Sequence, residues 1–241
     1  MTDEERQIEA EAIQYAKENR TQIARRLTDL KIFPAELRPA SVFMAGSPGA
    51  GKTEASIVLL EEFWKTDGVR ILRVDPDDLR KEIPGYNGRN SWLFQRAVTP
   101  IVERIHDLAL KQSQSFLLDG TLSNFDVACR NIERSLNKGR VVQILYVYQE
   151  PRQAWAFVQA RERVEGRNIP LGKFIEQYFA ARNVVNQLKL KYRSEVKVDL
   201  LLKNNDGTHR QYRAGVDQID NHIPEKYDPP TIAAMLARTD Q

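Results

Sequence analysis

The sequence predicts an α/β fold in which helices cover both faces of a mostly parallel sheet of about five strands. Short apolar runs alternate along the chain with longer segments of helical periodicity. The first run leads directly into a glycine-rich loop and a helix, and acidic turns follow the next two runs. This alternation is typical of parallel strands joined by crossover helices. The expected strands are residues 41–45, 69–74, 115–118, 141–148 and 197–202.

Composition limits the class of protein. The chain has 241 residues, 41% of them hydrophobic, which predicts one domain over residues 39–241 preceded by a helical extension over residues 1–38. The net charge of +3 is small for a nucleic-acid-binding protein and favours an anionic small molecule as ligand. Cys129 is the single cysteine, and the histidines lack metal-ligand spacing. We therefore expect a cytoplasmic protein that has no disulfide and does not span or bind a membrane.

The N-terminal extension carries apolar residues at helical spacing between charged ones. Over residues 3–31 this pattern predicts one or two amphipathic helices, which end before Pro34 and Pro39. Docking of this segment on the rest of the domain is the favoured interpretation. Binding to a partner protein is the alternative.

A phosphate-binding P-loop is predicted after the first strand, where the chain reads Gly46-Ser47-Pro48-Gly49-Ala50-Gly51-Lys52-Thr53. Its glycines let the backbone turn tightly and point several N–H groups at one anion. Lys52 adds a positive charge. Thr53 is at the start of the next helix, and the N-terminus of that helix favours binding of a phosphate. The hydroxyl of Thr53 can bind Mg²⁺. A glycine-rich turn without a ligand is the disfavoured alternative, because strand, loop and helix all fall where phosphate binding requires them.

Three carboxylates follow the second predicted strand, at Asp75, Asp77 and Asp78. Open α/β sheets bind their ligands at the carboxyl ends of strands. An ionised carboxylate there can accept a proton from a substrate hydroxyl or help to hold Mg²⁺. Aspartates also cap helices, and we expect at least one of the three to do so.

A further aspartate, Asp119, follows the next predicted strand and precedes Gly120 and Thr121. This is the layout of a Walker-B-like position, which would place Asp119 at the same edge of the sheet. The alternative is a turn aspartate that hydrogen-bonds to its own backbone.

The loop over residues 84–90 is rich in turn-forming residues and precedes a helix that contains Pro100 and Glu103. Proline is expected to kink this helix or to mark its true beginning. The loop either lines an acceptor pocket or is a plain surface connection.

Arginines border a glycine-containing loop that follows a predicted helix, at Arg161, Arg163 and Arg167. Guanidinium groups neutralise the charge on a phosphoryl group during transfer, and a mobile loop lets them close on a bound nucleotide. The alternative is a solvated helix face, because Glu162 and Glu165 alternate with the arginines.

Together these stretches resemble the zeta toxin family of bacterial kinases over roughly residues 40–205. The resemblance is carried by residues 46–53, 74–80, 118–122 and 163–170, in that order. It implies a P-loop kinase-like three-layer fold. It also implies an ATP- and Mg²⁺-dependent transfer of the γ-phosphoryl group to a hydroxyl of UDP-N-acetylglucosamine by the toxin of a toxin–antitoxin system.

The resemblance also implies roles for single residues. Lys52 and Thr53 would hold the triphosphate and the metal. Asp77 would be the catalytic base, supported by Asp75. The resemblance thereby selects one of the three carboxylates that follow the second strand.

On the acceptor side, the resemblance implies that Asp119 and Thr121 bind the substrate, with Glu103 as a second carboxylate. Arg163 and Arg167 would stabilise the phosphoryl group in transfer, and Arg161 would bind the nucleotide.

The chain departs from the family at two acceptor-side positions. Toxins of known substrate tend to carry Glu where this chain has Asp119, and an arginine near Leu122 and Ser123. Another acceptor, such as an antibiotic or a nucleoside, and a non-catalytic ATP-binding switch are therefore alternatives. The family's antitoxins are helical proteins that block the nucleotide site, which implies a possible protein partner. No nucleic-acid partner is expected.

Overall fold

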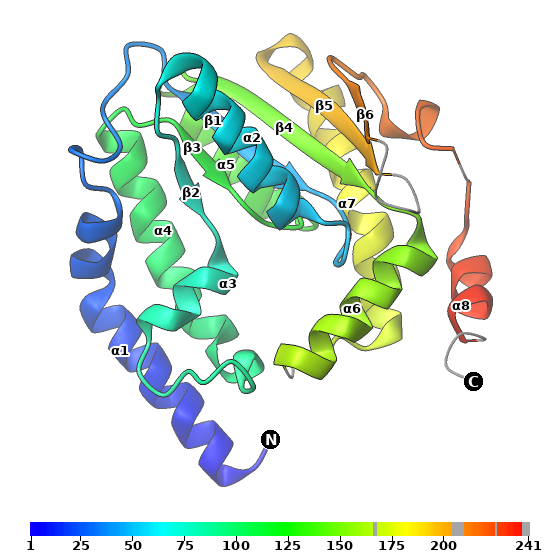
Figure 1. Cartoon of the computed structure of the whole chain (residues 1–241), viewed down its shortest axis with the longest axis horizontal. Coiled ribbons are helices and arrows are strands. Elements are labelled where there is room, and N and C mark those ends of the chain that lie inside the picture. The colour runs from blue at the N-terminus through cyan, green and yellow to red at the C-terminus, as the bar shows by residue number, and fades with distance from the viewer. Residues whose placement is uncertain (166–167, 204–209, 225, 238–241) are drawn as a thin grey trace.

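The computed structural model describes residues 1–165, 168–203, 210–224 and 226–237. One sheet runs through it in the strand order β2-β3-β1-β4-β5-β6 (Figure 1). Its strands are β1 (Ala40–Ala45), β2 (Leu72–Val74), β3 (Phe116–Leu118), β4 (Val141–Tyr148), β5 (Val196–Lys203) and β6 (Arg210–Arg213). Strands β1 to β5 are parallel, and β6 pairs antiparallel with β5. The predicted mostly parallel sheet is confirmed, and β6 is an edge strand beyond the runs that the sequence predicted.

Helices connect the parallel strands. The α-helices are α1 (Asp3–Leu27), α2 (Lys52–Asp67), α3 (Pro76–Leu79), α4 (Gln95–Lys111), α5 (Phe125–Leu136), α6 (Pro151–Glu165), α7 (Leu171–Tyr192) and α8 (Pro229–Ala237). Short 3₁₀ turns are η1 (Arg80–Glu82), η2 (Ser91–Phe94), η3 (Arg193–Glu195) and η4 (Ile219–Asn221). Pro100 lies inside α4. Within the described ranges, no helix has both the length and the apolar character needed to cross a bilayer.

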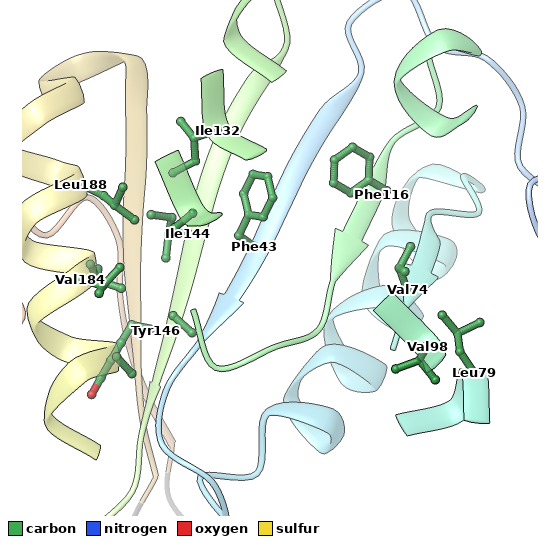
Figure 2. Packing of buried hydrophobic residues seen from close by; sticks show 14 of the residues in the cluster. Phe43, Val74, Leu79, Val98, Phe116, Ile132, Ile144, Tyr146, Val184 and Leu188 are labelled. Atoms are coloured by element: carbon green, nitrogen blue, oxygen red, sulfur yellow. The ribbon is translucent and has the colours of Figure 1, made fainter. Parts of the chain in front are cut away.

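Each face of the sheet is buried under helices, because side chains alternate between the faces along each strand. On one face, Met44 of β1 and Leu145 of β4 pack with Ala55 and Leu59 of α2. On the opposite face lies the larger cluster shown in Figure 2, which includes Phe43, Phe116, Ile132, Ile144, Tyr146, Val184 and Leu188. This gives the predicted three-layer arrangement of helices, sheet and helices.

The N-terminal helix α1 is part of the same packed body. It lies beside α4, at the left of Figure 1, and buries Ala16, Ile23 and Ala24 in the main core. Glu9 of α1 forms an ion pair with Arg96 of α4 at 3.6 Å. The predicted docking is therefore confirmed, by one helix that ends at Leu27, before the prolines.

Acidification is expected to destabilise the fold through His106 of α4. The ring is 3% exposed and lies against Phe43 and Phe116. Burial, together with the charges of Arg134 and Arg140, lowers the pKa of His106 to about 3 from its ordinary 6.5. Between these values the unfolded chain binds more protons than the folded chain, so the free energy of unfolding falls as pH falls, by up to about 1.4 kcal/mol per pH unit. Urea unfolding at several pH values should show a flatter dependence in His106→Leu.

The matched control is His222, which lies in the turn after η4, away from His106, Phe43 and Phe116. His222→Leu should leave the pH dependence of unfolding close to that of the unmodified chain. Equal slopes in His106→Leu and the unmodified chain would contradict the assignment.

Candidate active site

The predicted P-loop lies between β1 and α2, at the carboxyl edge of the parallel strands. Gly46, Gly49 and Gly51 have φ angles of 139°, 70° and 74°, which strain any residue with a Cβ atom. Gly51 is the N-cap of α2, and no side chain caps this helix end. The N-terminal N–H groups of α2 are thus not occupied by a capping side chain, which is the arrangement that suits an anion.

Neighbouring backbone fixes the shape of this loop. A Cβ atom on Gly46 would lie 2.4 Å from the carbonyl oxygen of Val147 in β4. One on Gly49 would lie 2.0 Å from the carbonyl oxygen of Ala154 in α6. The glycines are therefore required twice, for the turn and for the close approach of β4 and α6.

Replacing Gly49 by alanine is expected to lower the free energy of unfolding by about 3 kcal/mol or more, because backbone strain and a backbone clash add up. Gly68 is the matched control, since its φ is similar, at 64°, and a Cβ there meets nothing within 4 Å. Gly68→Ala should cost only about 1–2 kcal/mol. Urea unfolding of the two variants measures both values, and equal losses would show that close packing against Ala154 does not matter.

Lys52 and Thr53 form the first turn of α2. The Lys52 ammonium donates hydrogen bonds to the carbonyl oxygens of Gly46 (3.1 Å) and Ser47 (2.7 Å), which places its charge at the loop. The carbonyl oxygen of Thr53 accepts a hydrogen bond from Ser56 Oγ at 2.8 Å. The loop thus combines glycines with positive φ, a helix N-terminus without a side-chain cap, and an ammonium group. These features fit a polyphosphate.

Asp77 lies in the first turn of α3, directly after β2. Its backbone N–H donates to Asp75 Oδ1 at 2.8 Å, so Asp75 is the N-cap of α3. The expectation that one of the three carboxylates caps a helix is thus confirmed. Asp77 Oδ1 pairs with Arg80 at 3.0 Å, and Oδ2 accepts from Arg161 of α6 at 3.1 Å. The ion pair with Arg161 joins α6 to α3.

Arg73 of β2 binds three of the carboxylates that the sequence analysis identified as candidate site residues. Its guanidinium donates to Asp78 Oδ2 at 2.8 Å, to Asp119 Oδ2 at 3.0 Å and to Asp75. Asp119 Oδ2 also lies 3.2 Å from Ser56 Oγ, whose single proton it shares with the carbonyl oxygen of Thr53, and Asp119 is 4% exposed. Burial, together with the charge of Asp119, raises the pKa of Asp75, although Arg73 opposes this shift.

The other predicted residues are more scattered. The carbonyl oxygen of Thr121 accepts from the N–H of Gly46 at 3.3 Å, so the turn after β3 adjoins the P-loop. Arg163 is exposed on α6, and Glu103 is exposed on α4. Across the described part of the chain, Glu103 makes no hydrogen bond or ion pair with the P-loop or with the predicted base. Arg167 lies outside the described residues.

Sequence reasoning missed Arg73 and Arg80, which hold the acidic side chains in place. Arg80 is 1% exposed and also donates to Gln95 Oε1 at 2.6 Å. Both arginines carried a usable signal. Arg73 stands inside a short apolar strand just before the acidic turn, and Arg80 stands one helical turn after Asp77.

A family model for the zeta toxin matches residues 23–217. The chain belongs to the zeta toxin family. As a zeta toxin family member with this fold, it is a phosphotransferase of the P-loop kinase type. The sequence-based resemblance is thereby confirmed, and the match extends from within α1 past β6.

Solved structures show the same fold. A chain from the PezAT chromosomal toxin–antitoxin system of Streptococcus pneumoniae is 17% identical, with a TM-score of 0.58, over 99% of this chain and 95% of that one. A chain from the AvrRxo1-ORF1:AvrRxo1-ORF2 complex with sulphate ions is 16% identical, with a TM-score of 0.59, over 99% and 85%. The corresponding complex with ATP gives 16% and 0.57, over 94% and 76%. No curated protein matches the sequence.

Proposed function

We propose that the chain transfers the γ-phosphoryl group of ATP to a hydroxyl of a UDP-amino sugar, UDP-N-acetylglucosamine, and acts as the toxin of a toxin–antitoxin system. The observation that carries the proposal is the Asp77 carboxylate, held by Arg80 and Arg161 at the sheet edge that also carries the P-loop. Phosphoryl transfer to an alcohol needs these parts together: a phosphate cradle, an ionised carboxylate and cations.

In the proposed reaction, the P-loop amides and Lys52 hold the β- and γ-phosphates. Asp77 takes the proton of the acceptor hydroxyl while the acceptor oxygen forms its bond to the γ-phosphorus. The bond from that phosphorus to the bridging oxygen breaks, and ADP leaves. Arg163 and Arg167 neutralise the charge on the group in transfer, and Arg161 binds the nucleotide.

When bound, magnesium would supply positive charge that offsets the negative charge of the triphosphate. The hydroxyl of Thr53 is the protein ligand that we propose for it. Over the described residues, no group of three His, Cys, Asp or Glu side chains is arranged to hold a metal ion.

On the acceptor side we propose Asp119 and Thr121, with Glu103 as a second carboxylate and Asp75 as the support of Asp77. The hydrogen bonds that Asp119 accepts from Ser56 and Arg73 both fall on Oδ2. Its Oδ1 is therefore the oxygen that we assign to a sugar hydroxyl.

Mass spectrometry can test the reaction directly. Purified protein is incubated with Mg²⁺-ATP and a panel that contains UDP-N-acetylglucosamine, other UDP-sugars, nucleosides and hydroxyl-bearing antibiotics. We expect UDP-N-acetylglucosamine to gain one phosphate. A protein that binds ATP but phosphorylates nothing in the panel would be a nucleotide-binding switch, and the kinase proposal would be wrong.

The second candidate is a kinase for another small hydroxyl compound. The observation that favours it is the acceptor side itself, where Asp119 is short and buried and already binds Arg73. A phosphorylated nucleoside or antibiotic, with an unmodified UDP-sugar, would select this candidate.

A helical antitoxin is the proposed protein partner. The similar solved structures support it, because one belongs to a toxin–antitoxin system and the others are two-protein complexes. We propose the cytoplasm as the location, which the presence of a single cysteine in the sequence supports.

A further inference from the structure

Arg73 connects the P-loop helix α2 with the acidic turns that follow β2 and β3. It is the middle residue of β2, and its side chain is 17% exposed. Its Nε donates to Ser56 Oγ of α2 at 3.0 Å. Its two terminal nitrogens donate to Asp78 of α3, to Asp119 after β3 and to the α3 cap Asp75. One planar group thus joins α2, α3 and the end of β3.

The electrostatics make this guanidinium necessary. Asp75 and Asp119 are 8% and 4% exposed, and both bind the same nitrogen of Arg73. Two carboxylates so close together repel each other, and burial strengthens the repulsion. Arg73 is the cation that lies between them. Without it, the carboxylates would separate or one of them would take up a proton.

Hydrogen bonds extend from Arg73 in both directions. On one side, Asp75 accepts from Arg73 through Oδ2 and from the N–H of Asp77 through Oδ1, which fixes the first turn of α3. On the other side, Ser56 accepts from Arg73 and donates to the carbonyl oxygen of Thr53 in the first turn of α2. Arg73 itself makes no hydrogen bond to residues 46–53 in the described part of the chain.

From this network we infer that Arg73 is a positioning residue, which sets the place of Asp77 relative to the P-loop helix and thereby controls the rate of phosphoryl transfer without binding ATP. The inference rests on the proposed function, because it takes Asp77 as the base. A purely structural ion pair would instead change stability alone.

The test compares the full-length chain with Arg73→Ala and Arg73→Lys. With Mg²⁺-ATP and UDP-N-acetylglucosamine, we expect kcat to fall about 10- to 100-fold in Arg73→Ala, the usual range for a lost supporting hydrogen-bond partner. The Kd for Mg²⁺-ATP, measured by calorimetry, should stay within about threefold, because the P-loop is not contacted. Arg73→Lys keeps the charge without the planar fork, so it should fold and still lose part of kcat.

Chemical rescue separates positioning from stability. Millimolar guanidinium chloride should restore part of kcat in Arg73→Ala. The control is Arg134→Ala, which removes an ion pair with Asp107 between α5 and α4, outside the site, and should neither lose kcat nor respond to guanidinium. An unchanged kcat in both Arg73 variants, or a kcat loss without rescue and with an equal loss of ATP affinity, would overturn the inference.

A crystal structure of Arg73→Ala gives an answer that does not depend on the acceptor. The inference predicts that α3 and Asp77 shift relative to α2, and an α3 that stays in place would overturn it. Lack of product from the unmodified chain would instead count against the proposed function, while the structure of the variant would still decide the role of Arg73.

Discussion

Replacing Lys52 by alanine is expected to lower phosphoryl transfer by about 10²–10³-fold or more, because a preorganised donor to the transferring phosphate is lost. The ammonium lies at the loop, where it donates to the carbonyl oxygens of Gly46 and Ser47. Alanine is a good helix former, so α2 should persist while the ammonium group and its hydrogen bonds to the loop are lost. The rate of ADP formation with UDP-N-acetylglucosamine measures the effect, and calorimetry with Mg²⁺-ATP should show weaker binding of the nucleotide.

Lys65→Ala is the matched control, because Lys65 lies in the last turn of the same helix and is 64% exposed beside Glu62. This variant should keep full activity, since an exposed ion pair contributes little. If Lys52→Ala bound and turned over ATP as the unmodified chain does, the P-loop would not be the phosphate site.

The parts of the site that the sequence predicts are those encoded by neighbouring residues. The P-loop is one contiguous segment, so the spacing of its residues is enough to predict its glycines, its lysine and the start of α2. The same holds for the acidic turns after β2 and β3, because a short apolar run followed by aspartate marks the end of a buried strand. Family resemblance then chose Asp77 among the carboxylates.

The contacts of Arg73 and Arg80 were not predictable in this way. Arg73 contacts Asp119 only because β2 and β3 are adjacent in the sheet. The spacing of residues along the sequence does not predict the order of strands in a sheet. Likewise, Arg161 of α6 reaches Asp77 of α3 only because the folded topology brings these distant parts of the sequence within the length of one ion pair. Long-range pairing of charges depends on topology, which periodicity does not determine.

Replacing Asp77 by asparagine is expected to lower kcat about 10²–10⁴-fold, the usual contribution of a general base. Asparagine has nearly the same shape and keeps one oxygen that can accept from Arg80, so the fold of α3 should persist. It cannot take the proton of the acceptor hydroxyl. The Kd for Mg²⁺-ATP should change by no more than about threefold, since Asp77 lies outside the P-loop. Steady-state kinetics with UDP-N-acetylglucosamine and calorimetry with ATP measure the two quantities.

Loss of the Asp77 charge also leaves Arg80 with less compensation, because Arg80 is buried and its other partner is the neutral Gln95. We expect the free energy of unfolding to fall by about 1–3 kcal/mol, which urea titration can measure and which must be separated from the loss of kcat. Asp107→Asn serves as the control, because Asp107 pairs with Arg134 at the surface and takes no part in the site. An Asp77→Asn variant that is folded and fully active would transfer the role of base to another group, and the geometry around Arg80 and Arg161 would then have to serve stability alone.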